Sequence, residues 1–396
     1  MVEFKINLSA RGHDYIEEDI KAVIEAMKTA DPLTQGRYQT GFEEKFGEFN
    51  GSQHCFAVSN GTAALELAAL LCRLTPDDEV IIPGHTFCAT AIPFARTGAN
   101  IVWADIDPDT RVVSAQTIKP LITERTKVIV AVHLYGLMAS MPEIMQLARD
   151  HGLTVVEDCA QSPGSSIDGI KAGNFGDFGC FSFHTHKNMT TLGEGGMLVV
   201  KDEKDAAYVP GLRHNGLRGF DFERQRYWVP AMGNVDFDID NLWPYNFCIG
   251  EVQCAVGIRL LDRLEEMNRE RNKRAAQVID ELAAYPELSF QNVPAGYFHC
   301  YHLLSARYDG EQFGTSNHDF IDLMAFTHGV KVIVQYYPLY RYPMFQKAGL
   351  GEAHCPHTDH FYDNMVSLPF HHWMSDEEVD YMIACTKKTL DQLRCR

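Results

Sequence analysis

Short apolar runs alternate with helical patterns through the first half of this chain, and this alternation restricts the fold more than any other feature. The runs cover residues 79–83, 101–104, 128–132 and 154–158, and a helical pattern such as 142–151 lies between them. Runs that are apolar on both faces are typical of parallel strands covered by helices. We therefore predict an α/β fold with a mostly parallel sheet, whose ligands bind beyond the carboxyl ends of the strands.

Helical and strand patterns also precede these runs. Apolar residues recur at helical spacing between residues 13 and 28, and a second helix is expected at about 40–49. The apolar run 55–58 predicts a strand, which leads through the small polar turn SNGTAA (59–64) into a helix rich in Ala and Leu. Backbone amides at such a helix start can hold a phosphate, although Gly and Thr there are equally consistent with ordinary helix capping.

The strand pattern ends near residue 200. Residues 219–245 read as a loop dense in aromatic and charged side chains, and a long charged helix is expected over 250–282. Strand-like runs and a terminal helix at 376–393 follow. We therefore predict a large domain over residues 1–249, which includes the N-terminal helix, and a small C-terminal α/β domain over residues 250–396.

Composition excludes several classes of function. The 396 residues carry a formal net charge of −18, which argues against nucleic acid as a partner. No signal-peptide pattern opens the chain, and no run approaches the roughly 18 apolar residues of a membrane span, so we expect a cytoplasmic protein without membrane contact. The 11 cysteines have no C-x-x-C pairing and lie partly in apolar runs, which is typical of buried, reduced thiols.

The stretch GCFSFHTHK (179–187), followed by GEGG (193–196), places a lysine after an apolar strand. Burial of Lys187 would lower the pKa of its amine, which could then form a Schiff base with a carbonyl compound. The alternative is a surface lysine in a glycine-rich turn. His184 and His186 either pack within this turn or lie near a bound phosphate.

Other polar residues also follow strand-like runs. Asp158 needs a cationic or hydrogen-bonding partner, which could be a protonated pyridine nitrogen, a salt bridge or a helix start. Gln161 could bond a phenolic oxygen, Phe87 could lie against a ring, and Ser182 could share a phosphate with the turn at 59–64. Together with Lys187 these groups describe a site for pyridoxal 5′-phosphate. No metal site is expected, because the His-rich segment 354–360 has no common zinc spacing and is interpreted as a polar loop.

Several motifs in order resemble the DegT/DnrJ/EryC1/StrS family of sugar aminotransferases, a branch of the fold-type I, aspartate-aminotransferase-like pyridoxal phosphate enzymes. The motifs are SNGTAA (59–64), PGHTFCAT (83–90), EDCAQS (157–162), FSFHTHKN (181–188), GEGG (193–196) and SLPFH (367–371). The resemblance covers nearly the whole chain. It implies a seven-stranded, mostly parallel sheet between helices, with a smaller C-terminal α/β domain.

The resemblance also implies residue roles. Lys187 would bind the cofactor covalently and then act as the base and acid of the proton shift, while Asp158 would pair with the pyridine nitrogen. The other cofactor contacts would be Gln161 to the ring oxygen, Phe87 on the ring face, and Gly61, Thr62, Ala63 and Ser182 at the phosphate. Asn246 would reach the phosphate of the neighbouring subunit, which implies a homodimer with shared active sites.

Three features depart from the usual pattern of the family. Cys248 stands where an arginine is common, one extra residue separates Lys187 from Glu194, and the segment 219–245 is long and aromatic. A dehydratase branch has histidine in place of the lysine, but Lys187 fills the aligned position and His186 precedes it. Transamination is therefore favoured over dehydration.

The resemblance implies a pyridoxal-phosphate-dependent transaminase that moves an amino group from an amino acid, glutamate, to the keto group of a nucleotide-linked keto-deoxy sugar. A keto-cyclitol or another keto compound is the alternative acceptor, because the 219–245 segment could face the substrate. A non-catalytic, cofactor-holding relative is a second alternative, against which the intact Lys187, Asp158 and Gln161 count. A dinucleotide-binding oxidoreductase is disfavoured because no G-x-G-x-x-G follows the first strand.

Overall fold

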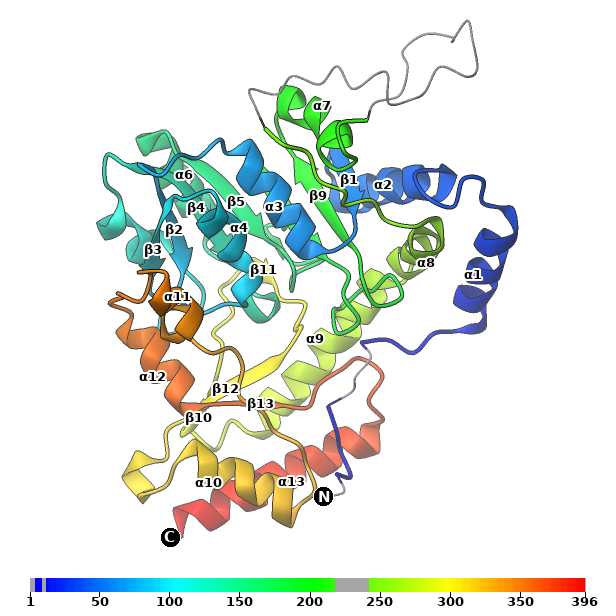
Figure 1. Cartoon of the computed structure of the whole chain (residues 1–396). Helices are drawn as coiled ribbons and strands as arrows, with labels where there is room; N and C mark the ends of the chain where they lie inside the picture. Colours follow the sequence, from blue (N-terminus) through cyan, green and yellow to red (C-terminus); the bar gives the residue numbers. More distant parts are fainter. Residues whose placement is uncertain (1–3, 9–11, 218–241, 396) are drawn as a thin grey trace, which may run out of the picture.

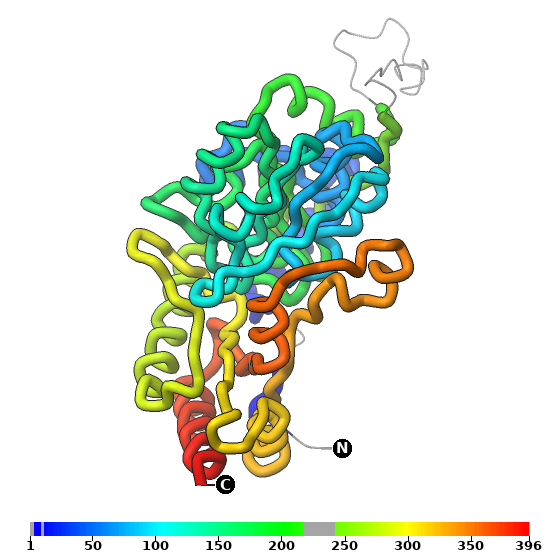
Figure 2. The backbone as a smooth tube through the Cα atoms, turned by 90° about the vertical axis from the view of Figure 1, so that its left-hand side faces the viewer, coloured from blue at the N-terminus to red at the C-terminus, as the bar shows by residue number. Residues whose placement is uncertain are grey.

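The computed structural model of the chain describes residues 4–8, 12–217 and 242–395. Its upper part in Figure 1 is built on a seven-stranded sheet, and its lower part on a small three-stranded sheet beside α10 (Asn317–Asp322) and α13 (Asp376–Arg394). The side view of Figure 2 shows the same two parts, with both labelled chain ends at the lower one.

The large sheet has the order β1-β9-β8-β5-β4-β2-β3. Its strands are β1 (His54–Val58), β2 (Glu79–Pro83), β3 (Asn100–Ala104), β4 (Thr126–Val132), β5 (Thr154–Asp158), β8 (Phe178–Ser182) and β9 (Gly196–Val200). Only β9 runs antiparallel to its neighbours, β1 and β8. The predicted seven-stranded, mostly parallel sheet is therefore confirmed, and the carboxyl ends of β4, β5 and β8 lie side by side.

Helices and short strands connect this sheet. They are α1 (Glu17–Thr29), α2 (Arg37–Asn50), α3 (Gly61–Leu71), α4 (Ile92–Arg96), α5 (Ala115–Ile118), α6 (Met141–His151), β6 (Ser166–Ile167), β7 (Ile170–Lys171) and α7 (Glu203–Leu212). The apolar faces of α2, α3, α4 and α6 pack with the sheet in one core. Burial of such faces is what stabilises helices of this length.

The C-terminal part contains a second core, which joins α9 (Leu264–Glu281), α10, α13 and the sheet β10-β12-β13. Its remaining elements are α8 (Glu251–Leu261), β10 (Leu288–Phe290), β11 (Tyr297–Phe298), β12 (Leu304–Tyr308), α11 (Pro343–Lys347), α12 (Pro356–Asn364) and β13 (Met365–Leu368). Ile6 packs in the second core, whereas α8, the start of α9 and residues 339–365 contribute side chains to the first. The domain boundary at 249/250 stays a prediction.

Two expectations were wrong in detail. The predicted single helix over 250–282 is two helices, α8 and α9, because the chain turns at Arg263, whose guanidinium binds the buried carboxylate of Asp19 in α1. The segment 354–360, interpreted as a loop, mostly forms α12. Pro356 starts this helix, and the Asp105 carboxylate accepts hydrogen bonds from the N–H groups of His357 and Thr358. Helix capping by a residue far away in the sequence leaves no local signal.

Candidate active site

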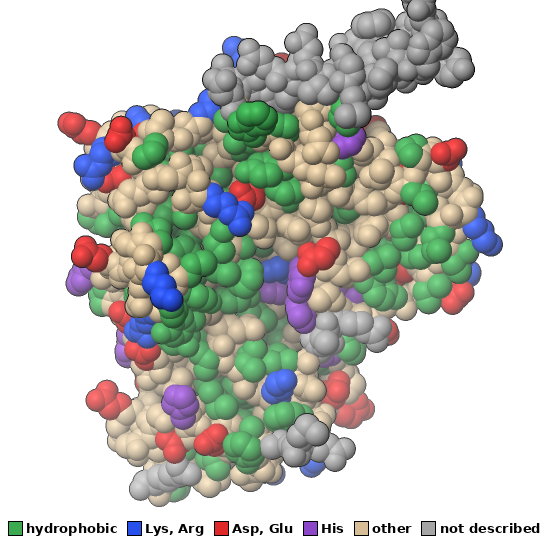
Figure 3. All heavy atoms as spheres, viewed as in Figure 1, with side chains coloured by type: hydrophobic (Ala, Val, Ile, Leu, Met, Phe, Trp, Pro, Cys, Tyr) green, Lys and Arg blue, Asp and Glu red, His purple; other side chains and the backbone are tan. Residues whose placement is uncertain are grey.

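A cavity of about 720 Å³ lies where the carboxyl ends of β4, β5 and β8 meet the start of α3, helix α9 and residues 331–336. In Figure 3, basic and histidine side chains gather in a hollow at the middle of the molecule. The lining includes most of the predicted site residues, namely Gly61, Thr62, Phe87, Asp158, Gln161, Ser182 and Lys187. Residues from separate strand ends therefore converge on one cavity, as the topology predicts.

Lys187 lies on the loop that follows β8, and the backbone holds this loop closely. Its N–H donates to the His184 carbonyl (2.9 Å), and the Gly12 N–H donates to the Thr185 carbonyl (2.6 Å). A Cβ atom at Gly12 would lie only 2.6 Å from the Lys187 carbonyl oxygen, so the segment before α1 packs closely against the loop and leaves no room for a side chain there. Leu192, between Lys187 and Glu194, has a left-handed φ of 62°, and Lys187 lines the cavity.

The amine of Lys187 has a lowered pKa. Burial lowers its pKa from 10.5 to about 8, although the negative charge of Asp158 acts in the opposite direction. About a tenth of the amine is therefore uncharged at pH 7, far more than for an ordinary lysine, and only the uncharged amine attacks a carbonyl carbon.

This pKa predicts a specific pH dependence of chemical labelling. Reductive methylation of the cofactor-free protein with formaldehyde and cyanoborohydride should label Lys187 with a midpoint near pH 8, because the uncharged amine is the reactive form. Peptide mass spectrometry over a pH series measures each lysine separately, so exposed lysines such as Lys201 serve as internal controls. A Lys187 midpoint near pH 10.5 would show that the amine is not desolvated.

Asp158 ends β5 and is 5% exposed. Its Oδ2 accepts a hydrogen bond from the Thr90 hydroxyl (2.7 Å), and its Oδ1 accepts one from the Ala160 N–H (3.1 Å). Within the described part of the chain, no lysine, arginine or histidine forms an ion pair with it. A buried carboxylate with neutral donors only is suited to a cationic partner from a ligand, such as a protonated pyridine nitrogen.

Gln161 and two aromatic residues form one wall of the cavity. The Gln161 Oε1 accepts the Tyr135 N–H (2.7 Å), which orients the amide so that its Nε2 lies 3.3 Å from the Tyr336 hydroxyl. Phe87 is 50% exposed and packs edge-on against Tyr336 with ring centroids 6.0 Å apart. A half-exposed ring and an oriented amide donor fit the predicted contacts to a flat, oxygen-bearing heterocycle.

The start of α3 forms a cradle beside β8. A Cβ atom at Gly61 would lie 2.7 Å from the Ser182 Cβ, so only glycine allows this approach. Asn60 caps the helix by accepting the Ala63 N–H (2.8 Å), whereas no acceptor is found for the N–H groups of Gly61 and Thr62 among the residues that the structure describes. These amides and the Ser182 hydroxyl fit a phosphate, while Ala63 is buried and does not line the cavity.

Asn246 is exposed and lies away from this cavity, where it pairs with His214 in an isolated β-bridge. Its contact with a neighbouring subunit stays a prediction. The Cys248 thiol donates to the Arg213 carbonyl (3.6 Å) within the same chain. Residues 219–241 of the long aromatic segment lie outside the described residues.

His184 and His186 both line the cavity, with ring centroids 5.1 Å apart. The His184 Nδ1 accepts the His186 N–H (3.4 Å), and its Nε2 lies 3.9 Å from the Glu194 carboxylate. Burial lowers the pKa of His186, and the charges of His184 and Lys187 add to this effect. Packing within the turn and proximity to the cavity therefore coexist.

The sequence analysis missed the residues that the C-terminal half contributes. The cavity is also lined by Arg271, His302, Lys331, Tyr336 and His371. Arg271 belongs to a helix rich in charges, where an arginine reads as a surface residue, so no local signal could have selected it. Only the folding of α9 and the segments after it against the large sheet brings these side chains to the cavity of Lys187.

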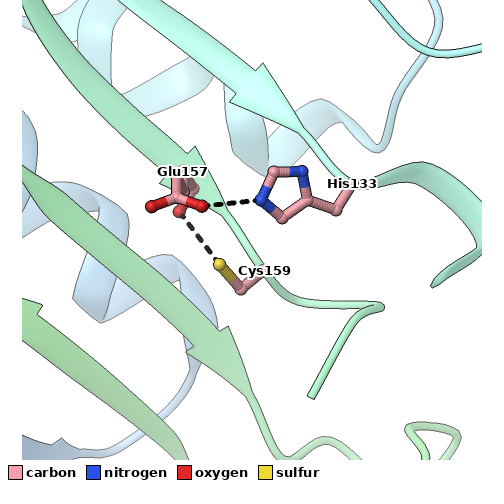
Figure 4. Close-up of side chains that lie close together, drawn as sticks. All are labelled: His133, Glu157 and Cys159. Carbon is pink, nitrogen blue, oxygen red and sulfur yellow. Dashed lines mark hydrogen bonds and ion pairs between the residues drawn. The ribbon is translucent and has the colours of Figure 1, made fainter. Parts of the chain in front are cut away.

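A buried network lies beside the cavity at the ends of β4 and β5 (Figure 4). The His133 Nε2 and the Glu157 carboxylate are 2.9 Å apart, and the Cys159 thiol donates to the Glu157 carbonyl (3.7 Å). The same carboxylate also accepts the N–H groups of Gly173, Phe175 and Gly176. This set has the residue types of a metal site, but the protein itself already supplies donors to the carboxylate. The network holds the β5 end from which Asp158 enters the cavity.

Replacement of Glu157 by glutamine should destabilise the protein. The new NH₂ group is a donor and would face the groups that now donate to the carboxylate, so some of these groups would lose their acceptor. The free energy of unfolding should therefore fall by about 2–4 kcal/mol. Urea unfolding of the cofactor-free protein measures the loss, and Glu203→Gln in the exposed first turn of α7 is the matched control. Equal stability of the two variants would mean that the network does not support the strand end.

Comparisons with known proteins agree with this architecture. A profile of the DegT/DnrJ/EryC1/StrS aminotransferase family matches residues 14–387. The chain is 33% identical over 356 residues to UDP-N-acetyl-3-dehydro-alpha-D-glucosamine 3-aminotransferase of Acidithiobacillus ferrooxidans, which covers 90% of this chain and 89% of that protein. It is 34% identical over 268 residues to L-glutamine:2-deoxy-scyllo-inosose aminotransferase of Streptomyces fradiae, covering 67% of this chain and 62% of that protein.

A solved structure has the same fold. PseC of Helicobacter pylori, described as an aminotransferase involved in the biosynthesis of pseudoaminic acid, superposes with a TM-score of 0.87 and 25% identity. The match covers 98% of this chain and 100% of that chain. No helix in the described residues is long and apolar enough to span a membrane. The family profile, the fold and the lysine-bearing cavity agree, and this chain belongs to the DegT/DnrJ/EryC1/StrS aminotransferase family.

Proposed function

We propose that this aminotransferase uses pyridoxal 5′-phosphate to move an amino group from glutamate to the keto carbon of a nucleotide-linked keto-deoxy sugar. One observation carries the proposal: an amine of lowered pKa, Lys187, lines the same cavity as Asp158, a buried carboxylate that has no ion-pair partner among the residues the structure describes. The free amides at the start of α3 add a place for the phosphate. The name of the Acidithiobacillus relative supports a nucleotide sugar as acceptor.

Each residue of the site would have its own role in binding the cofactor or moving a proton. The bound cofactor supplies an electron sink that makes the C–H bond beside the amino group acidic. The Asp158 carboxylate would keep the ring nitrogen protonated, and Gln161 would donate to the ring oxygen. Lys187 would hold the cofactor aldehyde and later carry the proton between the two carbon atoms that exchange it. Its pKa of about 8 suits a group that both takes and gives a proton near neutral pH.

A homodimer is part of the proposal. Helix α1 presents the side chains of Ile20, Ile24 and Met27, which are 46%, 46% and 65% exposed, on the outer side of the molecule. Green atoms gather over this helix in Figure 3. An apolar face of this kind favours burial against a second copy of the chain. The second copy would also provide the active site whose phosphate Asn246 is expected to contact. Sedimentation velocity of the cofactor-loaded protein would distinguish a dimer from a monomer.

The visible spectrum of the purified protein tests the function. Addition of glutamate should replace the band of the cofactor aldehyde by that of its amine form, and a keto acceptor should restore the first band. A panel of nucleotide-linked keto sugars then identifies the acceptor by amine formation. A protein without a cofactor band, even after reconstitution, would exclude the proposal, and a band that no amino acid changes would support a non-catalytic relative.

A keto-cyclitol is the second candidate acceptor. The Streptomyces relative is named for 2-deoxy-scyllo-inosose, which favours this alternative, although the match covers only 62% of that protein. The same panel should therefore include cyclitol ketones. Turnover of a cyclitol without turnover of any nucleotide sugar would replace the sugar assignment while leaving the aminotransferase chemistry intact.

A further inference from the structure

His302 is a buried histidine on the wall of the active-site cavity. It lies just before β12, is 5% exposed and lines the cavity that contains Lys187. Burial holds the pKa of its imidazole well below 6.5, and the positive charges of Lys187 and Arg271 act in the same direction, as would charged His184 and His186. The ring is therefore neutral at neutral pH, with a proton on only one of its two nitrogens.

Two side-chain amides determine which nitrogen of His302 carries the proton. The Asn268 Nδ2 donates to the Pro163 carbonyl (2.8 Å), so the Asn268 Oδ1 is the atom that faces Asn188. The Asn188 Nδ2 donates to this Oδ1 (3.1 Å) and to the Cys300 carbonyl (3.0 Å). The Asn188 Oδ1 is then the atom that lies 3.2 Å from the His302 Nδ1. Because an amide oxygen only accepts hydrogen bonds, the proton is on Nδ1, and Nε2 carries a lone pair.

The Nε2 atom of His302 has no hydrogen-bond partner among the residues that the structure describes. Such a nitrogen is not unusual in this protein, since His13 and His85 each have one, but neither of these residues lines the cavity. Gln335 and His371 do line it, and each has a side-chain oxygen or nitrogen without a partner in the described part of the chain. This wall of the cavity therefore offers uncharged polar groups whose partners a ligand could supply.

An unprotonated imidazole nitrogen restricts the ligand groups that can lie beside it. It accepts hydrogen bonds, and it repels a carboxylate or a phosphate because these groups are acceptors as well. In the proposed reaction, glutamate has N–H donors only on the nitrogen that is transferred, whereas a keto sugar or a keto-cyclitol carries hydroxyl groups near its keto carbon. The His302 ring binds Asn188, the residue after Lys187, so a hydroxyl group at Nε2 would lie near the reacting amine.

We propose that the Nε2 atom of His302 accepts a hydrogen bond from a hydroxyl group of the keto acceptor, a specificity contact that rests on the proposed function. The contact favours hydroxylated ketones, whether nucleotide-linked sugars or cyclitols, over keto acids. It holds the keto carbon beside Lys187 in the second half of the reaction, after the cofactor has taken up the amino group. Binding of the amino donor does not involve it.

Substitution of His302 by asparagine or by glutamine separates the roles of the two ring nitrogens. Asparagine places its NH₂ group near the position of Nδ1, so His302→Asn can keep the bond to Asn188 but has no acceptor in place of Nε2. Glutamine places its amide near the position of Nε2, so His302→Gln keeps an acceptor for the ligand but loses the bond to Asn188. His318→Asn is the matched control, because His318 is exposed on α10 and lies outside the cavity.

The test follows the reaction of the cofactor-loaded protein, in its amine form, with three ketones. They are GDP-4-keto-6-deoxymannose, 2-deoxy-scyllo-inosose and 2-oxoglutarate, which alone has no hydroxyl group. Rapid mixing gives the apparent Kd of each from the return of the aldehyde band. His302→Asn should weaken the hydroxylated ketone that wild type uses by roughly 3- to 10-fold, the scale of one hydrogen bond between neutral groups, and leave 2-oxoglutarate almost unchanged. His302→Gln should weaken it less, and His318→Asn should change neither.

Nitrogen NMR of the protein with ring-labelled histidine gives a readout without turnover. The aldehyde form of the cofactor carries no amino group to transfer, so the same hydroxylated ketones bind to it without reacting. The signals of His302 are those absent from His302→Asn, or from His302→Gln if the first variant does not fold. They should show a proton on Nδ1 and none on Nε2, and the Nε2 signal should shift when the ketone is added. A proton on Nε2, or an unshifted signal with either ketone, would overturn the inference.

The kinetic experiment can also contradict the contact. Equal weakening of the hydroxylated ketone and 2-oxoglutarate would mean that His302 only supports the loop, and so would a larger loss in His302→Gln than in His302→Asn. Reaction of wild type with 2-oxoglutarate but with neither hydroxylated ketone would mean that this wall binds no hydroxyl group. Failure of glutamate to change the visible band in wild type would contradict the proposed function alone, because the NMR shift still decides whether His302 contacts the ketone.

Discussion

Lys187→Ala should lose amino transfer by at least about 10³-fold, because the variant lacks both the amine that holds the cofactor and the group that moves the proton. The cavity remains, since the Lys187 backbone and not its side chain bonds the loop. The variant should therefore still bind the cofactor non-covalently. Treatment with borohydride followed by mass spectrometry should add the mass of the cofactor to the Lys187 peptide of wild type and to no peptide of the variant.

Lys201→Ala is the control for this experiment, because Lys201 is exposed and lies outside the cavity. It should keep wild-type turnover and the covalent link. Near-wild-type turnover of Lys187→Ala, or a cofactor mass on another lysine, would show that the loop alignment is wrong and that the reacting amine lies elsewhere.

Asp158→Asn should retain less cofactor after dialysis and lose turnover by roughly 10²- to 10⁴-fold, the range of a lost acid–base partner. Asparagine keeps the size of the side chain and an acceptor oxygen for Thr90, but its neutral amide cannot hold a proton on the ring nitrogen. The electron sink of the cofactor is then weakened although its place in the cavity is kept. Cofactor content per chain and kcat measure the two effects separately.

Asp168→Asn is the matched control, because Asp168 is exposed and does not line the cavity. Unchanged kcat in Asp158→Asn would exclude the pairing with a pyridine nitrogen and would make Asp158 a structural hydrogen-bond acceptor for Thr90. Glu157→Gln serves as a reference for stability, because Glu157 stabilises the same strand from the buried network. If Asp158→Asn loses folding rather than activity, its free energy of unfolding should fall as it does in Glu157→Gln.

Much of the large sheet was predictable from local patterns. The run 154–158 is apolar and β-branched until its acidic end, so β5 and the position of Asp158 at its carboxyl end follow from the sequence. The same reasoning places Ser182 at the end of β8, Lys187 after that strand and Thr62 at the start of α3. Parallel strands order their carboxyl ends along one edge, so residues at those ends meet without any knowledge of side-chain contacts.

Other features were not predictable because they depend on contacts between distant segments. The Arg263 guanidinium at the turn between α8 and α9 binds Asp19, and the Asp105 carboxylate caps α12; neither contact has a local signal, although Pro356 marks the start of α12 in the sequence. Ala63 is a different case, because the Asn60 side chain that accepts its N–H lies only three residues earlier, and this helix cap is one that the sequence of the turn 59–64 already allowed.

The sequence by itself determined the chemistry of one side of the site, since strand ends in a parallel sheet must converge and the residue types at those ends describe a cofactor. The tertiary structure alone decided the other side. Arg271, His302 and Lys331 reach the cavity because α9 and the segments after it fold back onto the large sheet. Hydrophobic periodicity reports which face of an element is buried, but not which element covers it, and the place of a charged side chain depends on that second choice.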